Sequence, residues 1–132
     1  MRLALIQMNS QTAARDENVD RACAFVDEAA GRGAEFAVLP EFFNVEYFPQ
    51  YRDYRYMDSA EPDDGYTQSH VKAKAREHKI CIVSTIFEVA RPGWYYDTVM
   101  LIGPDGEIAG KYRKVHPAAY LSLEKIYFRG GA

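Results

Sequence analysis

The hydrophobic positions of the chain fall into short runs and spaced stripes, a pattern that predicts alternating strands and helices. Residues 2–8 (RLALIQM) and 35–40 (EFAVLP) are short apolar runs typical of buried strands. Between them, residues 16–34 carry apolar side chains at helical spacing, namely Val19, Ala22, Cys23, Val26 and Ala30. A strand, a helix and a second strand in so short a stretch favour a parallel pair with a right-handed crossover.

Polar residues suggest where the helices begin and end. Asp16 is the expected N-cap of the first helix, and Gly31 and Gly33 are the expected stop signals. Residues 65–79 carry a weaker helical stripe that predicts a second helix. Between the two, residues 42–65 show no clear period, and so long a stretch without structure is usually functional or partly helical.

Three further strands follow. Residues 80–90, 95–103 and 107–114 are rich in β-branched and aromatic side chains and are separated by turns of the RPGW and PDGE type. The last eighteen residues show no obvious element. The order β-α-β-loop-α-β-β-β indicates an α/β fold in one domain over residues 1–132. The composition of several strands predicts burial on both faces, yet two helices are too few to cover them. We therefore expect this sheet to meet another sheet, or part of the fold to be missing.

Composition narrows the function classes. The 132 residues carry a formal net charge of −3, with acidic and basic residues interspersed, which argues against a nucleic-acid or polybasic membrane surface. The apolar run at the N-terminus is too short for a signal-peptide core or a membrane span. The two cysteines have no metal-ligand spacing and predict no disulfide framework. We expect a cytoplasmic protein without a metal or cofactor.

Glu41 is the first candidate for chemistry. It follows directly on the expected strand 35–40, and active-site residues of open α/β sheets usually lie past the carboxyl ends of strands. The adjacent Phe42 and Phe43 are expected to raise the pKa of this carboxyl group, which would suit a general base near neutral pH. A solvent-exposed or salt-bridged glutamate is the alternative.

Lys114 is the second candidate, at the end of the strand in GKYRKVH. Period-two alternation places Gly110, Tyr112 and Lys114 on one face and Lys111 and Arg113 on the other. A lysine at this point would stabilise a developing oxyanion or pair with Glu41. The alternative is a solvated basic edge that discourages strand-to-strand aggregation.

The other polar candidates are weaker on their own. Glu124 lies in a loop segment before aromatic residues, and His116 has no serine or cysteine motif beside it. His70 and His78 lie eight positions apart on the second helix, without a further ligand that would indicate a metal site. Cys23 and Cys81 occupy apolar stretches and are expected to be small core residues.

Taken together, the blocks VLPEFF around Glu41, YYDTVMLIGPDGEIAGKYRKVH around Lys114 and LEKIYFRGG around Glu124 resemble the nitrilase superfamily of carbon–nitrogen hydrolases. The opening LALIQMNSQ…DENVDRA is similar to the start of that family, so the resemblance covers essentially the whole chain. The EKIYF block resembles the N-carbamoyl amidohydrolase branch, which includes N-carbamoylputrescine amidases.

The resemblance implies an α-β-β-α sandwich, of which about the first half is present, and a small amide or N-carbamoyl substrate. By the family pattern Glu41 is the general base, Lys114 steadies the tetrahedral intermediate, and Glu124 orients substrate and lysine. A cysteine attacks the carbonyl or nitrile carbon. Phe42, Tyr47 and His116 are the expected substrate-binding residues. Family members commonly dimerise, so a homo-oligomer is expected.

Tyrosines crowd the segment that follows Glu41, where half of the ten lie between Tyr47 and Tyr66. This crowding fits a loop that faces the substrate or another subunit, and it fits equally a satellite hydrophobic cluster under a long loop.

The family's nucleophile has no counterpart in the chain. Neither Cys23 nor Cys81 matches the family's cysteine, which lies beyond the YF block, and the family's Pro-Gly-Asp reads GGA here. We therefore expect the chain to be the N-terminal half of an enzyme that is inactive alone. Two alternatives stay open: a truncated remnant that acts as a subunit or binding module, and an unrelated α/β binding domain in which Glu41 and Lys114 form a salt bridge.

Overall fold

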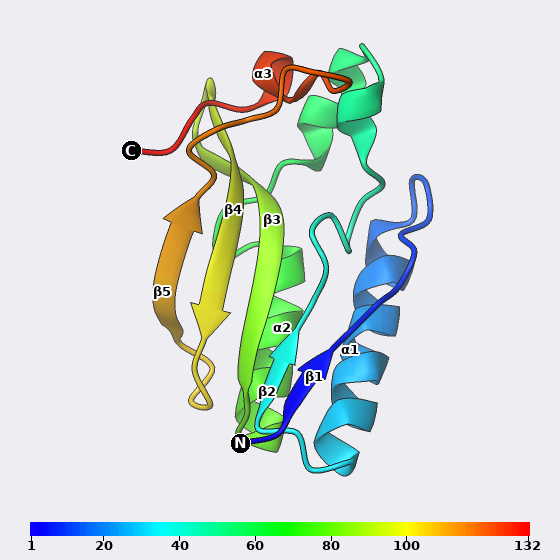
Figure 1. The fold of residues 1–132 in the computed structure, drawn as a ribbon, viewed down its shortest axis with the longest axis vertical. Coiled ribbons are helices and arrows are strands. Elements are labelled where there is room, and N and C mark those ends of the chain that lie inside the picture. The colour runs from blue at the N-terminus through cyan, green and yellow to red at the C-terminus, as the bar shows by residue number, and fades with distance from the viewer.

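A five-stranded sheet organises the chain in the computed structural model, which describes residues 1–132. The strands lie in sequence order: the first three run parallel, and the third to fifth form an antiparallel meander (Figure 1). The strands are β1 (Leu3–Leu5), β2 (Phe36–Val38), β3 (Cys81–Arg91), β4 (Trp94–Ile102) and β5 (Ile108–Arg113). The helices are α1 (Arg15–Gly31), α2 (Tyr66–His78) and the short α3 (Glu124–Tyr127), with 3-10 turns at Phe48–Gln50 and Tyr54–Ser59. The predicted order of elements is confirmed.

Helices α1 and α2 cover one face of the sheet. The stripe predicted for α1 is buried there, and Val71 and Ala75 of α2 meet it in the main core. Ala37, Ile82 and Ile102 supply the sheet's side of this core. Gly31 ends α1 as expected, and Gly33 follows with φ +79°.

The expected N-cap at Asp16 is wrong. Helix α1 begins at Arg15, and its N-cap, Ala14, makes no side-chain hydrogen bond. The carboxylate of Asp16 instead lies 2.9 Å from Arg15. The chain before the helix is tied by Asn18, whose side chain accepts a hydrogen bond from the Gln11 amide and donates one to the Gln11 carbonyl. A buried side chain in the first turn thus fastens the preceding segment to the helix, and no side chain caps the helix itself.

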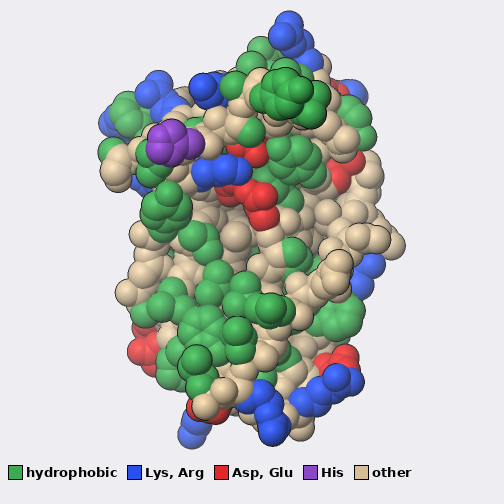
Figure 2. Space-filling model, viewed as in Figure 1, with side chains coloured by type: hydrophobic (Ala, Val, Ile, Leu, Met, Phe, Trp, Pro, Cys, Tyr) green, Lys and Arg blue, Asp and Glu red, His purple; other side chains and the backbone are tan.

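The other face of the sheet carries no helix. Residues directly opposite in the ladders share a face, and on this one Leu3 and Leu5 of β1 are 50% and 75% exposed. Leu101 of β4 and Tyr112 of β5 are also exposed there. Strands expected to be buried on both faces are therefore buried on one, because this chain supplies only one helical layer. Figure 2 shows hydrophobic side chains over the lower part of this face, and acidic and basic side chains together above them.

The tail carries more structure than expected. Residues predicted to have no element form α3, and Tyr127 and Phe128 complete a second core cluster with Phe42, Phe48 and Phe87. The Tyr127 hydroxyl donates to the Tyr51 carbonyl at 2.5 Å. The tail then returns to the meander, where the Gly131 amide donates to the Lys114 carbonyl at 2.9 Å. The C-terminal residues thus lock the end of β5.

Glu88 anchors the meander on the helix-covered face. Its side chain, only 1% exposed, accepts hydrogen bonds from Thr98 (2.6 Å), Lys111 (2.6 Å) and Arg113 (2.7 and 2.8 Å). Burial alone would raise the pKa of Glu88, but the bonds from Arg113, Lys111 and Thr98 outweigh it and lower that pKa to about 2. A carboxylate paired in this way must be ionised for the fold to keep its full stability.

This pairing predicts an acid-sensitive contribution to stability. Because the folded pKa lies below the ordinary 4.5, the contribution is fully present above pH 4.5 and is lost as the pH falls towards 2. We expect the free energy of unfolding, measured by urea denaturation, to fall over this range by about 2–3 kcal/mol more in the parent than in Glu88→Gln. Glu17→Gln, at an exposed site on α1, should follow the parent. Equal slopes for all three proteins would contradict the assignment.

Candidate active site

Glu41 is presented on the uncovered face, just past the carboxyl end of β2. The Leu39 amide donates to the Val83 carbonyl at 3.0 Å, and the Thr85 hydroxyl donates to the Pro40 carbonyl at 3.2 Å, so the chain stays beside β3 up to this point. It then turns sharply. Phe42 has φ +57°, a region that a bulky residue rarely adopts.

The turn separates Glu41 from its aromatic neighbours. Phe42 packs in the second core cluster, edge-to-face with Tyr47 and Phe48 at ring distances of 5.2 and 5.5 Å. Phe43 instead enters the main core under the helices. The strained backbone costs on the order of 1–3 kcal/mol, and this packing holds it in place. The side chain of Glu41 does not follow the two rings into the cores and stays 49% exposed.

Lys114 reaches the same place from the end of β5. The predicted alternation is confirmed: Lys111 and Arg113 bind Glu88 on the helix-covered face, so Lys114 emerges on the other. Its backbone amide donates to the Asp97 carbonyl at 2.9 Å, which continues the β4–β5 ladder by one residue. The ammonium group donates to Glu41 Oε1 at 3.1 Å and to Glu124 Oε1 at 3.0 Å.

Glu124 is fixed from several sides at the start of α3. One carboxylate oxygen accepts from Lys114 and, at 2.9 Å, from the Tyr47 hydroxyl. The other accepts from the Ala118 amide at 2.7 Å. The residue is 2% exposed, so a buried carboxylate is balanced by one lysine and two neutral donors. Three segments far apart in the sequence thus converge on one ammonium group.

The charges of the site shift the pKa values in opposite directions. Burial alone would lower the pKa of Lys114, but its bonds to Glu124 and Glu41 outweigh burial and raise it, so the lysine stays charged. For Glu41, burial acts to raise the pKa, yet hydrogen bonding with Asp97 and Lys114 and the lysine's charge lower it. The expected rise in the pKa of Glu41 is therefore wrong, because the bonds with Asp97 and Lys114 and the lysine's charge outweigh the effect of burial.

Asp97 is a member of this group that the sequence reasoning missed. It lies on β4, its side chain is 8% exposed, and its Oδ2 lies 3.3 Å from Lys114 Nζ. Burial, followed by the neighbouring Glu41, raises the pKa of Asp97 to about 7. The available signal was an aspartate within the otherwise apolar and aromatic run YYDTVML, where an unpaired carboxylate is rarely buried.

Of the expected substrate-binding residues, Phe42 and Tyr47 pack against each other, with ring centres 5.2 Å apart. Tyr47 binds Glu124 and Ser122 at the edge of the site, whereas Phe42 is buried behind it. His116 is exposed and lines a shallow cavity of about 370 Å³ together with Pro117 and Lys125. Tyr47 is the one of the three that touches the carboxylates directly.

The two cysteines lie away from Glu41. Cys23 is buried in the main core, where burial raises the pKa of its thiol to about 11. Cys81 begins β3 and pairs with Phe36 at the start of β2, at the opposite end of the sheet from Glu41. The expectation of a small core residue is confirmed for Cys23, whereas Cys81 is half-buried on the uncovered face, in line with Phe36 and Leu3.

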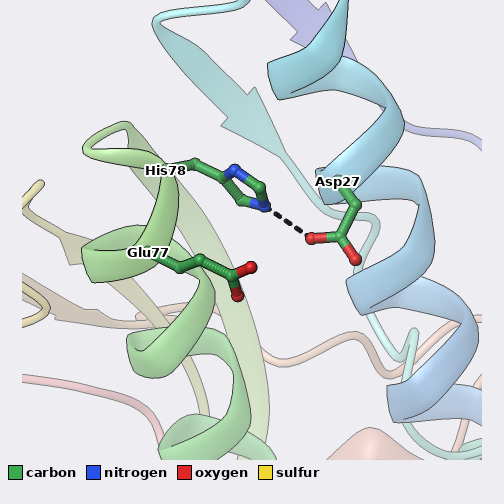
Figure 3. A group of neighbouring side chains, drawn as sticks. All are labelled: Asp27, Glu77 and His78. Carbon is green, nitrogen blue, oxygen red and sulfur yellow. Dashed lines mark hydrogen bonds and ion pairs between the residues drawn. The ribbon is translucent and has the colours of Figure 1, made fainter.

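A group of metal-type ligands occurs outside the site, between the two long helices. Asp27 of α1 faces Glu77 and His78 of α2, and His78 Nε2 lies 2.6 Å from the Asp27 carboxylate (Figure 3). Lys74 already neutralises this group, because its ammonium nitrogen lies 3.0 Å from both Asp27 Oδ2 and Glu77 Oε2. We read the group as an ion-pair network that joins α1 to α2.

No helix of the structure is long and apolar enough to cross a membrane.

Comparisons with known proteins show the family and the fold to which the chain is similar. The carbon-nitrogen hydrolase family model matches residues 2–132. Human omega-amidase NIT2 is 37% identical over 119 residues, which cover 87% of this chain and 40% of that protein. A nitrilase from Pyrococcus abyssi is 32% identical over 132 residues, covering 99% of this chain and 48% of that protein.

A solved structure shares the fold. The carbon-nitrogen hydrolase from Helicobacter pylori G27 superposes with a TM-score of 0.91 at 23% identity, covering 100% of this chain and 45% of that one. This agreement confirms the expected fold class, an α/β half of the nitrilase-type sandwich. The chain spans less than half the length of these relatives. With its sequence matched from residue 2 to residue 132, the chain belongs to the carbon-nitrogen hydrolase family.

Proposed function

We propose that residues 1–132 carry the general base, the oxyanion-stabilising lysine and the orienting glutamate of a hydrolase that cleaves carbon–nitrogen bonds in small amides. The observation that carries the proposal is the position of Lys114 Nζ, 3.1 Å from Glu41 and 3.0 Å from Glu124. A cation held between two carboxylates at the end of a sheet is a preorganised site for developing negative charge.

The roles follow from burial and charge. Glu41 is ionised and half exposed, so it can accept a proton from a nucleophile that approaches the uncovered face. Glu124 is buried and bonded on both oxygens, so it positions Lys114 and exchanges no proton. The hydrogen bond from Lys114 to Glu124 holds the ammonium group beside Glu41, on the uncovered face of the sheet.

The proposed reaction has two steps. Glu41 takes the proton of a cysteine thiol, and the thiolate attacks the carbonyl carbon to give a tetrahedral oxyanion beside Lys114. The carbon–nitrogen bond breaks, the proton passes from Glu41 to the departing ammonia, and a thioester is left. Water then attacks the thioester with Glu41 again as base, which releases the acid and the free thiol.

We propose that this cysteine is supplied by sequence outside residues 1–132. Neither Cys23 nor Cys81 lies at the site, and the chain spans 40% of human omega-amidase NIT2. The same sequence would supply a second sheet to cover the apolar face of β1, β4 and β5, which completes the α-β-β-α sandwich. The 132-residue chain alone is then expected to be inactive. The cytoplasmic location and the homo-oligomer stay predictions.

Two substrate classes compete within this function. Primary amides are favoured by the relative named an omega-amidase, and N-carbamoyl compounds by the EKIYF block around Glu124. Both place a carbonyl carbon bonded to a leaving –NH₂ at the same point, so the residues described here serve either one.

The test begins with the intact mass of the native polypeptide from its source cells, compared with 15.0 kDa for this chain. Ammonia release from primary amides, N-carbamoyl amino acids and nitriles is then measured on that polypeptide. Turnover of an amide or carbamoyl substrate supports the proposal. A native mass of 15.0 kDa without turnover would favour the non-catalytic binding module instead.

Glu124→Gln is expected to lower kcat/KM by about 10²-fold, because misplacing a catalytic group by about 1 Å has an effect of this size. A glutamine keeps one acceptor oxygen, so it can serve Lys114 and Tyr47 or the Ala118 amide, but not both sides. The measurement is steady-state kinetics on the native polypeptide. Glu17→Gln is the matched control at an exposed glutamate of α1. Parent-like kinetics for Glu124→Gln would remove this residue from the site.

A further inference from the structure

Asp97 is the ionisable group of the site that has no role in the proposed reaction. It lies on β4 directly opposite Phe87 of β3, and its side chain is 8% exposed. The charged groups around it are Glu41 from the segment after β2 and Lys114 from the end of β5, with Glu124 of α3 on the far side of the lysine. The neighbour on β3, Phe87, is neutral.

One oxygen of Asp97 is left without a hydrogen bond. Oδ2 is fully buried, and Lys114 Nζ lies 3.3 Å away but donates to Glu41 and Glu124 instead. A buried carboxylate oxygen without a donor is costly, and proteins rarely leave one. The simplest repair is a proton on Asp97 itself, which turns this acceptor into a donor.

An acceptor for that proton is close by. Glu41 Oε1 and Asp97 Oδ2 meet at the same ammonium nitrogen, Lys114 Nζ, at 3.1 and 3.3 Å, and each carboxyl group shifts the pKa of the other. Two carboxyl groups placed in this way do not both ionise readily, so they tend to hold one proton between them. Glu41 is the more exposed of the two and has the stronger bond to Lys114, so the negative charge settles on Glu41 and the proton on Asp97.

We propose that Asp97 is a positioning residue: its protonated carboxyl group donates a hydrogen bond to Glu41, and loss of that proton makes Glu41 a stronger base.

The inference deepens the proposed function, and its consequence for turnover rests on it. At acid pH the hydrogen bond from Asp97 stabilises the ionised form of Glu41 and weakens it as a base. When Asp97 ionises, Glu41 loses that donor and gains a neighbouring negative charge, and both changes raise its proton affinity. Turnover should therefore rise as the pH increases through about 7, the value to which burial raises the pKa of Asp97.

The proton is observed directly by NMR titration of ¹³C-labelled carboxyl groups in the 132-residue chain, which needs no turnover. We expect one aspartate signal to titrate near pH 7, against about 4 for an ordinary aspartate. That signal should be absent in Asp97→Asn and shifted in Glu41→Gln. Asp58→Asn, at an exposed aspartate, should leave it in place. Titration of every aspartate near pH 4 would overturn the proposal.

Kinetics test the consequence for Glu41. In the native polypeptide, kcat/KM should show an inflection near pH 7 that Asp97→Asn removes, because the asparagine amide donates to Glu41 at every pH. The variant should keep the low plateau of the parent across pH 6–8 and lie below the parent's upper plateau. Asp97→Ala, which has neither an ionisable group nor a donor, should also lack the inflection but should lie above the level of Asp97→Asn, because Glu41 then has no hydrogen bond that weakens it as a base.

The two measurements separate the proposals. A signal near pH 7 without turnover of any amide would sustain the shared proton and reject the proposed function. Turnover with an unchanged inflection in Asp97→Asn would sustain the function and reject the role of Asp97. Since asparagine nearly matches aspartate in size, Asp97→Asn should fold; if it does not, the parent titration together with Glu41→Gln still decides whether the proton is shared.

Discussion

Glu41→Gln is expected to lower kcat/KM by about 10²–10⁴-fold, the range typical for loss of a general base, while the free energy of unfolding changes by less than about 1 kcal/mol. The amide cannot take the thiol proton, so both steps of the reaction lose their base. Stability is spared because the side chain is 49% exposed and Lys114 keeps its bond to Glu124. The measurements are steady-state ammonia release by the native polypeptide and urea denaturation.

This pairing of measurements decides between two interpretations of Glu41. If Glu41 serves only as a salt-bridge partner of Lys114, the glutamine variant should lose stability and keep its turnover. Glu17→Gln provides the control for removing an exposed carboxylate elsewhere. Unchanged kcat/KM in Glu41→Gln would exclude the residue as the base.

Lys114→Met is expected to impair both turnover and folding. Removing a group that stabilises an oxyanion lowers kcat by about 10²–10³-fold. The same change leaves Glu124 and Asp97, whose side chains are 3% and 8% exposed, without their shared cation. Breaking a buried ion pair by removing one partner costs about 3–5 kcal/mol. We expect a loss of that order in the free energy of unfolding, measured by urea denaturation near pH 7.

The matched control is Lys72→Met on α2, at a lysine with no ion pair in the structure, which should stay within about 0.5 kcal/mol of the parent. A deficit below 1 kcal/mol at neutral pH would show that the carboxylates do not depend on this lysine.

The sequence allowed the elements and the face on which Lys114 lies to be predicted, because both rest on simple periods. Helical spacing located the buried stripe of α1. Period two separated Lys114 from Lys111 and Arg113, and the ladder between β4 and β5 confirms that separation. These are local properties of the chain, so neighbours in sequence were enough to reveal them.

The errors arose where a backbone turn changed which neighbours matter. Phe42 and Phe43 follow Glu41 in sequence, yet both rings turn into cores after the positive φ of Phe42. The expected rise in the pKa of Glu41 became a fall because Asp97 and Lys114, from distant segments, bind its carboxylate. Asp97 was missed because its partners come from other segments, after β2 and at the end of β5. No periodicity predicts such a meeting.

The tail shows the same limit. Tyr127 and Phe128 are ordinary aromatics in a short segment without a period, and only the distant Phe48 and Phe87 give them a place to pack. Likewise, Asp16 is a residue type that often caps helices, but the segment before α1 is held by two hydrogen bonds between Asn18 and Gln11.

The sequential strand order has a kinetic consequence. The meander β3–β4–β5 is built from hairpins whose partners are close in sequence, such as Val89 with Tyr95, and local pairings of this kind form early. Pairing of β2 with β3 joins Phe36 to Cys81 and must close the long loop between them. Lys114 and Asp97 should therefore be in place before Glu41 docks. The contact of Glu41 with Lys114 and Asp97 would then form only after the slowest loop closure of this sheet.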